Sequence, residues 1–104
     1  MAEVRLAALD ELVPGEARRF DVGGRRVAVV RIDDAVYVIG DRCSHAEASL
    51  SEGAVAVDAT TIECPKHGAL FSLATGAPET LPATKPVPSY AVRIADGDVF
   101  VELS

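Results

Sequence analysis

Short runs of apolar residues alternating with polar ones make up most of the chain, and helical periodicity is almost absent. Gly23-Gly24 and Asp33-Asp34 are turn sequences between three of these runs, which predicts an antiparallel meander. Even strand spacing without crossover helices predicts an all-β sandwich or barrel. The predicted strands cover residues 3–9, 17–22, 25–32, 35–40, 60–64 and 69–73, and a final hairpin covers 90–103.

Two stretches interrupt this pattern. Residues 41–59 show no regular alternation, and residues 74–89 are rich in Pro and Thr. Proline lacks the amide hydrogen that a central strand donates, so the second stretch is expected to be irregular. We expect one domain over residues 1–104, with a base of about 1–40 and 77–104 that carries a smaller inserted subdomain of about 41–76.

Composition is typical of a globular protein, with 49% apolar and 25% charged residues. Because the chain shows neither an export signal nor an apolar run of membrane length, we expect a cytoplasmic protein without a membrane partner. The net charge of -6 argues against nucleic-acid binding and favours a protein partner with a basic surface. In a reducing compartment, two cysteines are more typical of metal binding or catalysis than of a disulfide.

The two cysteines and two histidines of the chain fall into two pairs, "CSH" and "CPKH". Cys43 and His45 lie in the first irregular stretch, and Cys64 and His67 lie at the predicted tip between two strands. Histidine is a poor core residue, and packing does not explain why both residue types occur only in these two turn-rich loops. The grouping predicts that all four side chains are metal ligands.

Two kinds of centre fit these ligands. One tetrahedral zinc ion could be bound by two thiolates and two imidazoles, as in a structural module. Zinc fingers, however, usually group their cysteines together, whereas here each loop contributes one thiol and one imidazole. The side chains of Cys43 and His45, two residues apart, reach two ions a few ångströms apart more readily than one. The grouping therefore favours a [2Fe-2S] cluster with Cys43 and Cys64 on one iron and His45 and His67 on the other.

This pattern, Cys-x-His followed after eighteen residues by Cys-Pro-x-His-Gly, resembles that of Rieske-type [2Fe-2S] ferredoxins. The resemblance is strongest to the small ferredoxin components of bacterial aromatic-ring dioxygenases. It covers nearly the whole chain, through the segments "ELVPGE", "AVYVIGDRCSH", "SLSEG", "IECPKHGALFSLATG" and "LPATKPVPSYAVRI". It implies a Rieske fold, an antiparallel β base that carries a cluster-binding subdomain.

The resemblance also implies a function. The protein would carry single electrons from a flavin-dependent reductase to a terminal non-haem iron oxygenase through transient docking, and would not be an enzyme by itself. We expect a monomer. Nitrite reduction or iron-sulfur assembly is the alternative pathway for such a carrier, and a zinc-stabilised structural module is the alternative outside this class.

Rieske proteins of respiratory complexes differ from this chain beyond the second ligand loop. They carry a bracing disulfide, as well as Ser and Tyr hydroxyls at the positions that Ala69 and Phe71 occupy here. Fewer hydrogen bonds to the cluster sulfurs predict a low potential, roughly -150 mV. Backbone N–H groups of Ala46 and Gly68 are then the expected remaining donors.

Overall fold

The computed structural model describes residues 2–44, 47–66, 68–81 and 83–103, and this part of the chain is nearly all β. It forms strands and two short 3-10 helices, and none of its helices is long and apolar enough to cross a membrane. In chain order the elements are β1 (Ala2–Ala8), η1 (Leu9–Glu11), β2 (Ala17–Val22), β3 (Arg25–Ile32), β4 (Ala35–Gly40), η2 (Leu50–Glu52), β5 (Val55–Ala56), β6 (Thr61–Glu63), β7 (Leu70–Ser72), β8 (Ser89–Tyr90), β9 (Val92–Ala95) and β10 (Asp98–Leu103).

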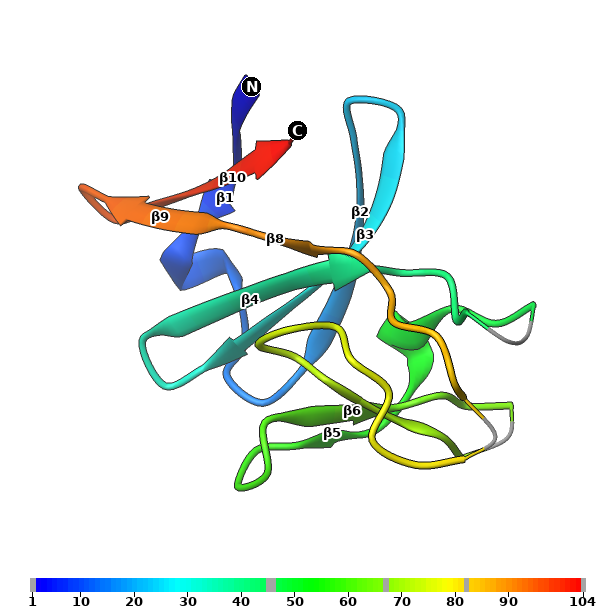
Figure 1. The fold of residues 1–104 in the computed structure, drawn as a ribbon. Coiled ribbons are helices and arrows are strands. Elements are labelled where there is room, and N and C mark those ends of the chain that lie inside the picture. The colour runs from blue at the N-terminus through cyan, green and yellow to red at the C-terminus, as the bar shows by residue number, and fades with distance from the viewer. Residues whose placement is uncertain (1, 45–46, 67, 82, 104) are drawn as a thin grey trace.

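The strands form three antiparallel sheets, with strand orders β1-β10-β9, β2-β3-β4-β8 and β5-β6-β7 (Figure 1). The third sheet lies apart from β1, β9 and β10, on the other side of the sheet that contains β4. The four-stranded sheet therefore lies between the other two. The all-β fold expected from the sequence is confirmed.

Strand β3 explains how one small chain builds cores on two sides of a sheet. Its run Val27-Ala28-Val29-Val30 is buried on both faces, so it is continuously apolar rather than alternating. Val27 and Val29 face a core that we call the valine core, and Ala28 and Val30 face a second one, the cysteine core. The cysteine core consists of Ala28, Val30, Ile39, Cys43, Leu50, Ile62, Cys64, Ala69, Phe71, Leu73, Ala83 and Val87.

The predicted last hairpin divides between two sheets. Its turn is at Asp96-Gly97, where both residues have positive φ angles, of 52° and 77°. Before Ala91, however, Tyr90 pairs with Val38 of β4, whereas the residues after Ala91 pair with β10. The first part of the run thereby closes the edge of the four-stranded sheet and links the two sheets that enclose the valine core.

An ion pair joins the two outer strands of the first sheet. The Arg93 guanidinium of β9 donates hydrogen bonds of 2.9 and 2.6 Å to the Glu3 carboxylate of β1, across β10. These hydrogen bonds hold the pKa of the Glu3 carboxyl below its ordinary value. Arg93 also lies over the Phe100 ring, 4.5 Å from its centroid. The Arg93–Glu3 ion pair thus links β9 to β1 across β10, in the sheet that contains neither cysteine loop.

Candidate metal centre

The loop that carries Cys43 begins with a buried acid. Asp41 directly follows β4, and no part of it is exposed. Its carboxylate accepts hydrogen bonds from the Ser49 hydroxyl and, at 2.9 Å, from the Ser51 N–H. Its own N–H donates to the Arg26 carbonyl at 3.1 Å, and its carbonyl accepts from the Leu50 N–H at 2.6 Å. Asp41 therefore closes the first loop at its base and ties it to β3.

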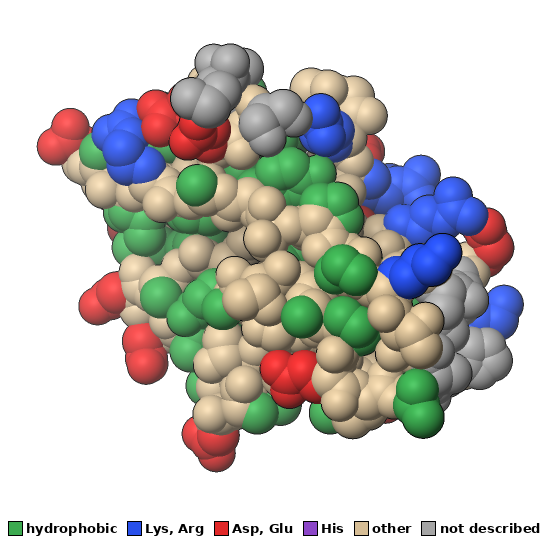
Figure 2. Space-filling view, in the orientation of Figure 1, with side chains coloured by type: hydrophobic (Ala, Val, Ile, Leu, Met, Phe, Trp, Pro, Cys, Tyr) green, Lys and Arg blue, Asp and Glu red, His purple; other side chains and the backbone are tan. Residues whose placement is uncertain are grey.

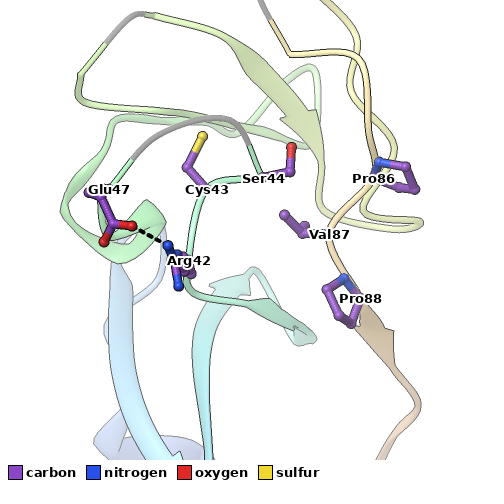
Figure 3. A pocket seen from close by; sticks show the side chains of 7 residues that line it. All are labelled: Arg42, Cys43, Ser44, Glu47, Pro86, Val87 and Pro88. Carbon is purple, nitrogen blue, oxygen red and sulfur yellow. Dashed lines mark hydrogen bonds and ion pairs between the residues drawn. The ribbon is translucent and has the colours of Figure 1, made fainter.

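Cys43 lies inside this closed loop. Its N–H donates to the Ala48 carbonyl at 3.0 Å, and only 2% of the residue is exposed. The thiol and the Arg42 side chain point in opposite directions, and Arg42 pairs with Glu47 at the surface (Figure 3). A cleft of about 570 Å³ lies along this loop, between Ser44 and the proline segment at 86–88. The backbone hydrogen bond to Ala48 thus holds Cys43 in place, while the charged groups of Arg42 and Glu47 remain exposed to solvent.

Cys64 occupies the connection between β6 and β7. The Cys64 N–H donates to the Ala69 carbonyl at 2.7 Å, and the Cys64 carbonyl accepts from the Gly68 N–H at 2.9 Å. Gly68 has a φ of +75°, which favours glycine at this position. The expected donor at Gly68 is thus engaged within the turn. The Cys64 thiol is completely buried.

The two loops are in direct contact through Gly53, which follows η2. A Cβ added to Gly53 would lie 1.6 Å from the carbonyl oxygen of Glu63, the residue before Cys64. Only a hydrogen atom fits at the Cβ position of this residue. The backbone of the first loop therefore packs directly against the strand that leads to the second cysteine. A hollow of about 280 Å³ also joins the loops, lined on one side by Glu47, Ala48, Ser49 and Glu52 and on the other by Pro65 and Lys66.

A third segment, which we call the strap (residues 79–81 and 83–88), crosses both loops. The Ser44 hydroxyl donates to the Lys85 carbonyl at 2.7 Å, next to Cys43. The backbones of Val87 and Gly76 are in contact, and the Val87 N–H donates to the Gly76 carbonyl at 2.9 Å. A Cβ on Gly76 would lie 2.1 Å from the Val87 carbonyl oxygen. The strap is therefore a fixed part of the site rather than a loose connection.

The two thiols belong to one apolar core, and no disulfide joins them. His45, Ala46 and His67 lie outside the described residues, so the predicted imidazole ligands and the Ala46 donor are not placed. Within the described ranges, no group of three or more metal-ligating side chains occurs. Two buried thiols on two joined loops, each loop with a histidine in its sequence, fit the donor set of a two-iron cluster.

Ala69 and Phe71 lie in the wall of the cysteine core, and neither is exposed. Leu50 packs in the same core. Neither Ala69 nor Phe71 carries a hydroxyl, so this wall offers no side-chain donor at those two positions. Its contribution is to exclude water.

Sequence reasoning missed the residues that hold the loops together. Asp41 reads as a surface turn residue in the sequence, and Gly53 reads as an ordinary loop glycine. A weak signal was present, because Asp41 follows an apolar strand and two serines occur eight and ten residues later. Neither contact could be read locally, since Gly53 meets Glu63 only when two separate segments pack together.

The chain matches the family model of the Rieske [2Fe-2S] domain over residues 2–91. Together with the all-β fold and the two buried thiols, this match shows that the chain belongs to the Rieske [2Fe-2S] domain family.

Comparison with individual proteins shows which members of the Rieske family this chain resembles. The chain is 41% identical to the 3-phenylpropionate/cinnamic acid dioxygenase ferredoxin subunit of Escherichia coli K12, over 99% of this chain and 95% of that protein. The solved ferredoxin of carbazole 1,9a-dioxygenase from Nocardioides aromaticivorans IC177 is 44% identical, covers 97% of both chains and superposes with a TM-score of 0.94. A ferredoxin solved in complex with the reduced oxygenase of carbazole 1,9a-dioxygenase is 39% identical over 95% of this chain and 91% of that one, with a TM-score of 0.86.

These relatives are ferredoxin subunits rather than catalytic subunits. The cofactor of the family is one Rieske-type [2Fe-2S] cluster, and the chain is an electron-transfer component of this class.

Proposed function

We propose that this protein accepts single electrons from a flavin-dependent reductase and delivers them to a terminal non-haem iron oxygenase that attacks aromatic rings. The observation that carries the proposal is the likeness to dioxygenase ferredoxins over almost the full length of both chains. A solved complex of a relative with its oxygenase supports the second half of the pathway. The reductase follows from the sequence resemblance alone.

For the ligands, we propose Cys43 and Cys64 on one iron and His45 and His67 on the other. Two buried thiols held in the same core by two joined loops support the cysteine pair. When bound, a cluster with two neutral imidazoles supplies one-electron chemistry at a potential above that of an all-thiolate cluster. The chain contributes the geometry: Asp41 closes the first loop, and Gly68 shapes the turn of the second.

The surrounding residues keep water away from the thiols. Leu50, Phe71 and Ala69 are fully buried around Cys43 and Cys64, which places the sulfur atoms in a medium of low dielectric. Because Gly68 donates its N–H within the turn, Ala46 is the proposed main-chain donor that remains.

The proposed division of the chain is a base of about 1–40 and 77–104 and a cluster-binding subdomain of about 41–76. A cytoplasmic location and a monomeric state belong to the same proposal.

Charge is distributed unevenly over the surface. In Figure 2 acidic side chains lie mainly along the left and lower parts of the face, and most basic ones gather toward the right. Figure 1 places the loops that follow β4 and β6 on that right side. Net charge alone therefore does not define the charge of the docking face, although it still favours transient, salt-sensitive association.

Direct electron transfer tests the proposal. The protein is reduced anaerobically, freed of reductant and mixed in a stopped-flow instrument with the oxidised terminal oxygenase of carbazole or 3-phenylpropionate dioxygenase. We expect the ferredoxin to be reoxidised as the oxygenase is reduced, at a rate that rises to saturation with oxygenase concentration. Substrate turnover on adding a flavin-dependent reductase and NADH tests the first half of the pathway.

Failure of both oxygenases to accept electrons, with rapid transfer to a nitrite reductase or to an iron-sulfur assembly protein instead, would contradict the proposal. That result would support the alternative pathway for the same cluster.

A further inference from the structure

Leu81 of the strap is the most exposed large apolar residue in the described parts of the chain. Its exposed fraction is 79%, against 55% for Val13, 44% for Val57 and 39% for Ile94. Single exposed apolar residues are ordinary on protein surfaces, so exposure alone carries no argument. What distinguishes Leu81 is how its backbone is held and where it lies.

The strap is fixed on both sides of Leu81. Just before it, the Glu79 N–H donates to the Leu70 carbonyl at 2.7 Å, and the Thr80 hydroxyl accepts from the Leu70 N–H at 2.8 Å. Just after it, Ala83 is buried in the cysteine core with 4% exposure. The described residues on both sides of Leu81 are therefore attached to the rest of the site, while 79% of Leu81 itself is exposed. Leu81 is thus an exposed apolar residue on a segment whose described neighbours are held in place.

The same attachments place Leu81 between the two cysteine loops. Leu70 directly follows Ala69, whose carbonyl accepts the Cys64 N–H, and farther along the strap the Lys85 carbonyl accepts from Ser44, next to Cys43. Leu81 lies on the short span between these two attachments. We expect a protein that binds over the two cysteine loops to contact this span of the strap as well.

We propose that Leu81 is a docking anchor for the terminal oxygenase and inserts into an apolar recess of that partner. This rests on the proposed function. The oxygenase is the occupant because a relative that covers 95% of this chain has been solved in complex with one. Because the strap is already held at Glu79, Thr80 and Ala83, docking does not have to order its backbone, which lowers the entropic cost of binding.

The test compares Leu81→Thr with Ile94→Thr. Ile94 lies in β9, which Figure 1 places on the opposite side of the molecule from the strap and the loops after β4 and β6, so it is the matched control. Reduced wild type and variants are mixed with the oxidised oxygenase, and the transfer rate is measured against oxygenase concentration. We expect Leu81→Thr to raise the half-saturating concentration about tenfold, since burial of a leucine is worth at least that factor. The rate at saturation, the potential and the EPR spectrum should match those of the wild type, and Ile94→Thr should change none of them.

Half-saturation within a factor of about two of wild type for Leu81→Thr would overturn the proposal, because burial of the side chain predicts a larger change. An effect seen only with the reductase would overturn it too, since the occupant would be the reductase. These results leave the proposed function intact. Wild-type protein that transfers no electron to the oxygenase would instead overturn the proposed function and the anchor together.

Discussion

Replacing Cys64 by serine is expected to give a folded but colourless protein without acid-labile sulfide. Cys64 is completely buried, and its backbone is fixed by hydrogen bonds with Ala69 and Gly68. A serine would keep this backbone and lose the thiolate, which is the ligand that iron-sulfur clusters require. The same loss is expected for Cys43→Ser, because each loop contributes one thiol.

Iron and sulfide analysis with visible spectroscopy measures this effect. Ser44→Ala is the matched control, since it removes the hydrogen bond to Lys85 beside Cys43 without removing a ligand. The control should retain the full iron content of the wild type. If Cys64→Ser retained two irons per chain with an unchanged spectrum, or if the wild type held stoichiometric zinc, the ligand assignment would be wrong.

Gly53→Ala is expected to destabilise the protein strongly and to reduce cluster retention. The φ of Gly53 is -86°, which any residue adopts, so the cost comes from the new Cβ alone. That atom would lie 1.6 Å from the Glu63 carbonyl oxygen, and the two backbones must separate to admit it. Overpacking of this severity costs about 3 kcal/mol. For a domain of this size the corresponding decrease in Tm is roughly 15 °C.

Gly24→Ala provides the comparison. Gly24 has a φ of +78°, and an added Cβ would meet nothing within 4 Å, so only the conformational penalty applies. That penalty is about 1 to 2 kcal/mol. Thermal unfolding of the loaded proteins, followed by circular dichroism and by cluster absorbance, measures both. Equal Tm values for the two variants would show that the first loop is not packed against β6 as described.

Much of the fold could be predicted because its turns are local. The bounds of β2, β3 and β4 are those that the apolar pattern predicts, since Gly23-Gly24 and Asp33 adopt the positive φ angles that tight turns need. By contrast, β5 has only two residues, Val55–Ala56, too few for any alternation. The division of the last hairpin at Ala91 could not be predicted, because membership of a sheet depends on distant strands.

In the site, too, local features could be predicted from the sequence, whereas contacts between distant segments could not. Cys43 and Cys64 could be proposed as ligands from the sequence, because the spacing of Cys and His is a property of a short segment. Asp41 and Gly53 could not, because their roles arise from burial and from contact between separate segments. The division of the four ligands between two irons stays a prediction, since His45 and His67 lie outside the described residues.

The central claim is that the two loops hold a Rieske cluster that works as a low-potential one-electron carrier. An EPR-monitored redox titration of the purified protein tests it most directly. We predict a protein that is EPR-silent when oxidised and gives one unpaired spin per chain after one-electron reduction. The midpoint should lie near -150 mV, at the low end of the Rieske range, because Ala69 and Phe71 provide no hydroxyl donor. A colourless, EPR-silent protein in both states, or a midpoint well above 0 mV, would contradict the account.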